Sequence, residues 1–96
     1  MTTLIYYLIG ADGEETMPRL EVVGEIHGAV HWFADMAAMV SVGALERLGF
    51  TELLKFARKG DVLIVPSLDR LGTDAAELRI VFQAFKKKGV TIISLR

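Results

Sequence analysis

The sequence predicts an α/β fold in which helices cover both faces of a mainly parallel, four-stranded sheet. Four short apolar segments predict strands, at residues 3–9, 30–34, 61–66 and 90–95. Segments with helical spacing or helix-capping signals separate most of them, and strands that alternate with helical crossovers are typical of parallel sheets. The expected order of strands along the sheet is 2-1-3-4.

The N-terminal half is expected to form a strand, a loop, a helix and a second strand. Residues 3–9 (TLIYYLI) are apolar almost throughout, as in a strand that is covered on both faces. The composition of residues 10–16 (GADGEET) predicts a loop. Apolar side chains then recur at roughly helical spacing behind Pro18, which predicts a helix over residues 18–27. No element is predicted for residues 35–48.

Two helices alternate with the strands of the C-terminal half. The first is expected over residues 50–58. The second should begin after Asp74, whose side chain suits an N-cap, with Glu77 as the reciprocal capping partner. It should end before Gly89, because three lysines complement the helix dipole there and glycine suits the following position. The whole order of elements predicts a single flavodoxin-like domain of three layers.

Composition limits the class of protein. The chain has 96 residues, of which 52% are hydrophobic, which indicates one ordered domain. No apolar run approaches the roughly 20 residues that span a bilayer, and the N-terminus lacks the positive start of a signal peptide, so a soluble, cytoplasmic protein without membrane contact is expected. The absence of cysteine excludes disulfides and thiol catalysis. The net charge of −1 predicts that any DNA contact is weak or indirect.

The segment SLDRLGTD, residues 67–74, connects a predicted strand to the helix that follows it. It places Asp69 beside Arg70, and α/β proteins often keep their working residues beyond the carboxyl ends of the strands. The residues alone allow two interpretations, a functional site or a surface ion pair of the common kind.

Residues 60–95 (GDVLIVPSLDRLGTDAAELRIVFQAFKKKGVTIISL) resemble the catalytic domain of the serine recombinases, the resolvase and invertase family. Ser41 and Arg47 resemble a serine and an arginine that precede a short helix in that family. The opening LIYYLIG is similar to the family's first strand, with Tyr6 at the position of its tyrosine. The resemblance covers nearly the whole chain and is most specific from Arg47 to Leu95.

The resemblance implies a chemistry for the motif. In this family a serine hydroxyl attacks a DNA phosphodiester and forms a phosphoserine linkage, with no metal or other cofactor. Arg47 and Arg70 would then hold phosphate, since guanidinium groups offer it a planar fork of donors. Asp69 would orient Arg70 or take part in proton transfer. Without the resemblance, Arg47 has a simpler interpretation as a solvated loop arginine.

Four positions depart from the family pattern, all in the same direction. Gly10 stands where the family has its nucleophilic serine, and Leu8 stands where the first strand has an arginine. Thr73 replaces an arginine and Glu14 replaces a glutamine. Glycine carries no nucleophile, so covalent catalysis is expected to be lost, and the missing cations weaken the expected phosphate site.

The family continues into a long dimerisation helix and a helix-turn-helix domain, neither of which is expected within residues 1–96. We therefore expect a truncated, catalytically degenerate recombinase-like domain that associates with itself or with a full-length recombinase and modulates site-specific recombination. One alternative is an active strand-exchange recombinase. Another is a small response-regulator-like binding module, which the absence of a glycine-rich phosphate loop after the first strand disfavours.

Three further groups of residues allow a structural and a functional interpretation. His27, His31 and Asp35 recur every four residues, but the strand predicted between them disfavours a metal site. The lysines before Gly89 suit the end of a helix, with a DNA phosphate contact as the alternative. One apolar group forms either part of the core or an exposed patch for a partner: Trp32, Phe33, Met36 and Met39.

Overall fold

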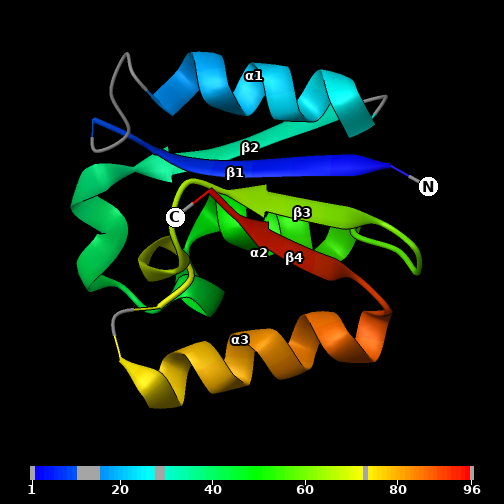
Figure 1. Ribbon diagram of the computed structural model, residues 1–96. Coiled ribbons are helices and arrows are strands. Elements are labelled where there is room, and N and C mark those ends of the chain that lie inside the picture. Colours follow the sequence, from blue (N-terminus) through cyan, green and yellow to red (C-terminus); the bar gives the residue numbers. More distant parts are fainter. Residues whose placement is uncertain (1, 11–15, 28–29, 73, 96) are drawn as a thin grey trace.

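Four parallel strands form one sheet at the centre of the molecule (Figure 1). The computed structural model describes residues 2–10, 16–27, 30–72 and 74–95. The strands are β1 (Thr3–Ile9), β2 (Val30–Met36), β3 (Val62–Val65) and β4 (Thr91–Ser94). Their order along the sheet is β2-β1-β3-β4, and each neighbouring pair is parallel, so the predicted order is confirmed.

Helices cover both faces of the sheet. The α-helices among the described residues are α1 (Thr16–His27), α2 (Leu48–Phe56) and α3 (Ala75–Lys88). None of them has the length and the apolar character needed to cross a membrane. Figure 1 shows α1 on one face of the sheet and both α2 and α3 on the other, which confirms the three-layer, flavodoxin-like architecture.

The β1 strand lies in the middle of the sheet because its side chains are apolar on both faces. Tyr6 and Leu8 point into the larger core, where they pack with residues of α2 and α3. Ile5 points to the opposite face and packs with Leu20 of α1 and Ile64 of β3. The first strand is therefore apolar almost throughout because both of its faces are covered, as predicted.

Local signals fix both ends of α3. The Asp74 carboxylate accepts a hydrogen bond from the Glu77 N–H at 2.8 Å, as expected of an N-cap. Gly89 ends the helix in the left-handed conformation, with φ at 78°. The Glu77 carboxylate accepts a hydrogen bond from the Ala44 N–H at 3.1 Å, which joins α3 to the segment that precedes α2, and its predicted reciprocal bond with the Asp74 N–H stays a prediction.

The boundaries of β2 and α2 differ from the predicted ones. The predicted second strand, residues 30–34, ends two residues too early, and the predicted helix at 50–58 both begins and ends two residues too late. The strand is longer than predicted because it stays paired with β1 as far as Met36. The Asp35 carboxylate accepts hydrogen bonds from the N–H groups of Gly49 and Phe50, and this contact with another segment favours the earlier start of the helix.

Short 3-10 helices occupy most of the connection for which no element is predicted, and another follows β3. They are η1 (Ala37–Ser41), η2 (Ala44–Glu46) and η3 (Leu68–Arg70).

Candidate functional site

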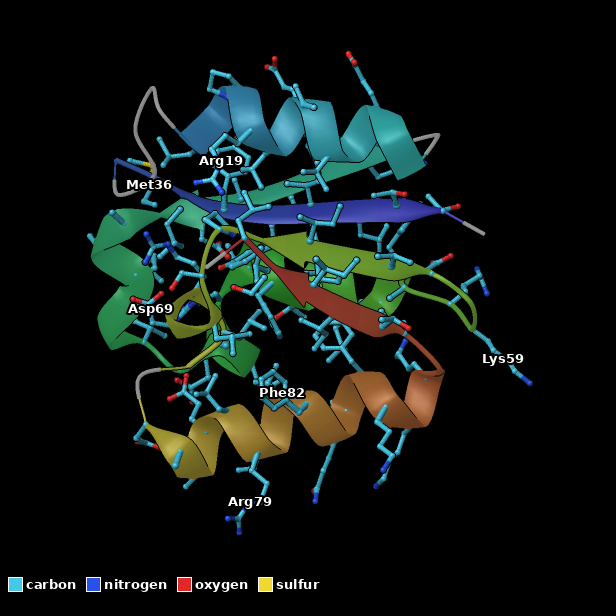
Figure 2. All side chains as sticks on the ribbon, in the orientation of Figure 1. Arg19, Met36, Lys59, Asp69, Arg79 and Phe82 are labelled. Carbon is cyan, nitrogen blue, oxygen red and sulfur yellow. The ribbon has the colours of Figure 1, made fainter. Side chains whose placement is uncertain are left out.

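The candidate site lies at the edge of the sheet where the parallel strands end. Gly10 follows β1, and Asp69 and Arg70 lie in η3, just beyond β3. Because β1 and β3 are parallel neighbours, their carboxyl ends meet at one edge. Figure 2 shows Asp69 at the same end of the molecule as Met36, the last residue of β2. The structure therefore brings Gly10, Asp69 and Arg70 to one edge.

Asp69 and Arg70 form an ion pair at the surface of this edge. Arg70 Nη1 lies 3.1 Å from Asp69 Oδ1, and the Ser67 hydroxyl donates a hydrogen bond to the same carboxylate oxygen. The Asp69 side chain is 65% exposed, whereas that of Arg70 is only 14% exposed. An ion pair with so exposed a carboxylate contributes little to stability, so these contacts fit the structural interpretation of the motif. A role in phosphate binding stays a prediction.

Arg47 is completely buried, so its interpretation as a solvated loop arginine is wrong. Its Nε donates to the Val42 carbonyl at 3.0 Å, and its Nη1 donates to the Arg70 carbonyl at 2.6 Å. Nη1 also lies 3.4 Å from the Tyr6 hydroxyl oxygen. Arg47 therefore holds the backbone of the η3 loop against β1 and the segment that precedes α2.

Asp35 is the acidic centre of the same partly buried network, and sequence reasoning did not place it there. The Tyr6 hydroxyl donates to Asp35 Oδ2 at 2.7 Å. The N–H groups of Gly49 and Phe50 donate to the two carboxylate oxygens at 2.8 and 3.0 Å. A carboxylate at this position satisfies the first N–H groups of α2 and complements the positive end of its dipole.

The surroundings of Tyr6 keep its hydroxyl protonated. Burial raises the pKa of the Tyr6 phenol well above its ordinary value, the hydrogen bond from Arg47 opposes the rise, and the Asp35 carboxylate adds to it. Tyr6 therefore remains a hydrogen-bond donor to Asp35. No signal in the sequence pointed to this link, because Asp35 falls where the predicted pattern ends.

Gly49 allows α2 to lie close enough to Asp35 for these hydrogen bonds to form. A Cβ atom at Gly49 would lie only 2.1 Å from the carbonyl oxygen of Ala34, so α2 can start this close to β2 only with glycine at this position. The glycine brings the first N–H groups of the helix within reach of the carboxylate.

Gly10 has a backbone conformation that favours glycine. Its φ is +96°, and the nearest atom to a Cβ built there is the Cβ of Ala37, at 3.5 Å. A side chain would thus find space, but an L-residue would strain the backbone. A serine at this position would therefore require the chain to rearrange.

The other predicted positions of the site are distributed differently. Leu8 is 1% exposed and belongs to the larger core, so an arginine there would bring a charge into apolar surroundings. Glu14, Thr73 and the side chain of Ser41 lie outside the described residues.

The structure also bears on the two interpretations of the histidines and of the apolar group. Within the described residues, no three acidic, histidine or cysteine side chains group as metal ligands, and the His31 ring packs on Phe56 with centroids 4.6 Å apart. His27 has no described side chain. Trp32 and Met36 are exposed, whereas Phe33 packs against the larger core, so the apolar group is divided between surface and interior.

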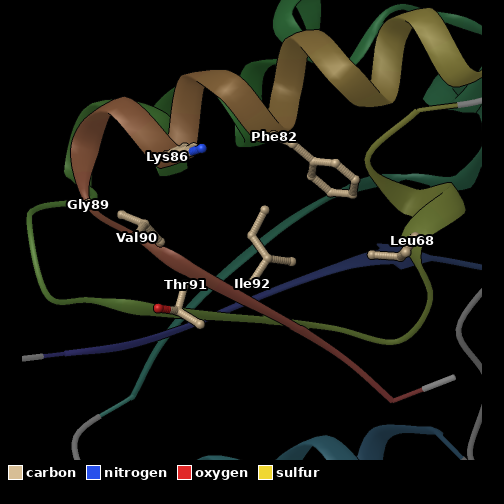
Figure 3. Close-up of a pocket in the computed structure, with 7 residues that line it drawn as sticks. All are labelled: Leu68, Phe82, Lys86, Gly89, Val90, Thr91 and Ile92. Carbon is tan, nitrogen blue, oxygen red and sulfur yellow. The ribbon is translucent and has the colours of Figure 1, made fainter.

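An open groove borders the η3 loop between α3 and β4 (Figure 3). Its volume is about 610 Å³. The residues that line it are Leu68, Phe82, Lys86, Gly89, Val90, Thr91 and Ile92. Neither Arg47 nor Arg70 lines this groove, so it is separate from the candidate phosphate site.

Known proteins resemble parts of this chain. A family model described as "Resolvase, N terminal domain" matches residues 13–96. A stretch of 39 residues is 56% identical to the transposon Tn2501 resolvase of Escherichia coli, and covers 41% of this chain and 20% of that protein. The chain thus matches about a fifth of the length of that curated relative. The family match begins after Gly10, so the placement of Tyr6, Leu8 and Gly10 on the family's first strand stays a prediction.

Proposed function

Since the chain belongs to the family of resolvase N-terminal domains, we propose that it acts in site-specific DNA recombination by association, without cleaving DNA itself. The partner is a second copy of the chain or a full-length recombinase. The chain then retains the fold of the family's domain but lacks the nucleophile of its reaction centre.

The proposed loss of DNA cleavage rests on Gly10. It stands at the position that the family resemblance assigns to the nucleophilic serine, and it offers no hydroxyl. Its φ of +96° supports the view that the glycine is now built into the turn after β1. A reversal would therefore need more than one substitution.

The surroundings of the arginines support a weakened phosphate site. The donors of Arg47 named above are directed at the Val42 and Arg70 carbonyl groups and at the Tyr6 hydroxyl, all within the protein. Leu8 fills the core where the family pattern has another cation. Arg70 is left as the candidate to meet phosphate, and Asp69 already pairs with it.

Exposed apolar residues support a role in association. Ile9 and Met36 are register partners at the ends of β1 and β2, and they are 46% and 57% exposed. These two residues make an apolar pair at the same edge as Gly10. Such side chains are candidates for a contact with another recombinase domain.

A test for covalent chemistry addresses the loss of cleavage. The chain and its Gly10→Ser variant would be incubated with supercoiled plasmid and then denatured in detergent, with Gly10→Ala as the matched control for backbone strain. We expect no protein–DNA adduct from any of the three. An adduct from the wild type would refute the proposed inactivity. An adduct from Gly10→Ser alone would show that the phosphate site is intact.

A second experiment tests association. The Tn2501 resolvase would carry out its own reaction in the presence of increasing amounts of the chain, while light scattering measures the mass of the mixture. We expect a mixed complex and a slower reaction, both lost in Met36→Asp and kept in Val22→Asp, a control with equal exposure of 57%. A chain that stays monomeric and leaves the reaction unchanged would refute the association.

A further inference from the structure

We propose that the end of the molecule opposite the candidate site binds the phosphate backbone of DNA. The surface consists of six side chains, here called the basic end: Lys55, Arg58, Lys59, Lys86, Lys87 and Lys88. The choice of DNA as the ligand rests on the proposed function. The existence of an anion-binding surface rests on the structure alone.

The basic end is formed by two segments that are distant in the sequence and in contact in the fold. The Gly60 N–H donates to the Gly89 carbonyl at 3.0 Å, which joins the turn after α2 to the end of α3. Lys88 Nζ lies 3.4 Å from the Ala57 carbonyl oxygen across the same junction. Figure 2 shows Lys59 at the opposite end of the sheet from Asp69.

The charge of this end is unbalanced. Residues 55–61 and 86–91 hold six of the eleven lysines and arginines of the chain, but only one of its twelve acidic residues, Asp61. These segments therefore carry a formal charge of +5, against −6 for the rest of the chain. Asp61 is 5% exposed and accepts hydrogen bonds from the backbone N–H groups of Thr2 and Arg58.

The side chains of the basic end have no acidic partners in the described part of the molecule. The ion pair found there joins Asp69 and Arg70, at the other end of the sheet. Lys88 is half-buried and the other five side chains of the basic end are exposed. Their charges are thus available to a ligand.

Helix stability accounts for only part of this arrangement. Lysines in the last turns of α2 and α3 complement the helix dipoles. Arg58 and Lys59 follow the last turn of α2 and so gain less from its dipole. Six like charges gathered at one end repel one another, which disfavours the folded state. An anionic ligand removes that repulsion.

The pattern of charges suits a polyanion better than a single small anion. Five exposed, flexible cations are spread over two adjoining turns. Lysines act as separate point charges, and such side chains meet the repeated phosphates of a duplex without reading its bases. The contact is expected to be independent of sequence and strongly dependent on salt. It would leave the opposite edge, with Gly10 and Arg70, free to face another protein.

The test is a salt titration of DNA binding by fluorescence anisotropy. A labelled duplex of roughly 30 base pairs and arbitrary sequence would be titrated with the chain at several salt concentrations. The double variant Lys59→Gln, Lys87→Gln removes two charges from the basic end. The double variant Arg19→Gln, Arg79→Gln removes two exposed charges elsewhere and is the matched control.

We expect the slope of log affinity against log salt to fall by about 1.8 in the variant of the basic end, since each lost phosphate contact is worth about 0.9. The control should keep the wild-type slope, and both variants should stay folded, as circular dichroism would show. Lys87→Gln alone, with an expected fall of about 0.9, keeps the test valid if the double variant folds poorly.

Three results would overturn the proposal. They are an equal loss in both double variants, the absence of wild-type binding at low salt, and tighter binding of poly-glutamate than of the duplex. The last result would assign the basic end to an acidic protein surface. The assay needs neither DNA cleavage nor a partner recombinase, so its failure would leave the proposed function standing.

Discussion

Replacing Asp35 by alanine is expected to destabilise the fold by about 2 to 3 kcal/mol. The change removes a carboxylate that accepts hydrogen bonds from the Tyr6 hydroxyl and from the N–H groups of Gly49 and Phe50. It leaves α2 without its N-terminal acceptor and leaves a buried hydroxyl without that partner.

The magnitude follows from these contacts. Loss of a side-chain acceptor at a helix N-terminus costs about 1 kcal/mol. Loss of a hydrogen bond to a charged group costs about 1.5 kcal/mol or more. Asp35 itself is half-buried, so water can replace part of what is lost, which keeps the sum near the lower values. A domain of this size has a total stability of about 5 to 15 kcal/mol, so the loss is large.

Urea denaturation, followed by circular dichroism, measures this loss. The matched control is Asp69→Ala, which removes the same side chain from an exposed ion pair and is expected to cost less than about 1 kcal/mol. A double-mutant cycle with Tyr6→Phe then isolates the coupling between the phenol and the carboxylate. Equal losses for Asp35→Ala and Asp69→Ala would refute the account of the network.

Gly49→Ala is expected to lower the free energy of unfolding by about 3 kcal/mol, because the new Cβ would lie 2.1 Å from the Ala34 carbonyl oxygen. In the control Gly43→Ala the nearest atom to the new Cβ lies at 4.0 Å, so the melting temperature should change little. Equal melting temperatures for these two variants would contradict the close approach. Asp74→Ala should cost about 1 kcal/mol through the lost N-cap bond, and a helix signal that melts as in the wild type would argue against that cap. The pKa of Tyr6 is raised in the folded chain, so above pH 10 the phenol ionises in the unfolded chain but not in the folded one. The contribution of Tyr6 to stability is therefore complete below pH 10 and falls by about 1.4 kcal/mol per pH unit above pH 10. Tyr6→Phe should lose this extra alkaline slope in urea titrations at pH 9 to 11, and a persistent slope would show that another group causes it.

The sequence predicts those parts of the fold that depend on neighbouring residues. The four strands follow from their apolar composition, and α3 follows from Asp74 and Gly89, whose capping geometry is local. The boundaries of β2 and α2 could not be predicted in this way. They depend on contacts between segments: β2 stays paired with β1 as far as Met36, and Asp35 accepts hydrogen bonds from the first turn of α2.

The candidate site is predictable in position but not in its contacts. Asp69 and Arg70 lie after a buried strand, and the parallel order of the sheet suffices to place them at the same edge as Gly10. The burial of Arg47 has no signal in the sequence, because an arginine in a weakly patterned segment suggests solvent. Two of its hydrogen-bond acceptors are backbone carbonyls, which no sequence pattern marks, and a third is the hydroxyl of the distant Tyr6.

Because Arg47 is buried and holds the fold together, this residue can be retained even in a domain whose reaction is lost. A chain that no longer cleaves DNA would still need this side chain, because without it the η3 loop would lose its hold on the core. Selection for a folded domain would therefore preserve this arginine even where selection for phosphate chemistry had ceased. Among relatives of this chain, an intact arginine at this position would thus not be enough to indicate activity, and we expect the residue at position 10 to be the more informative one to inspect.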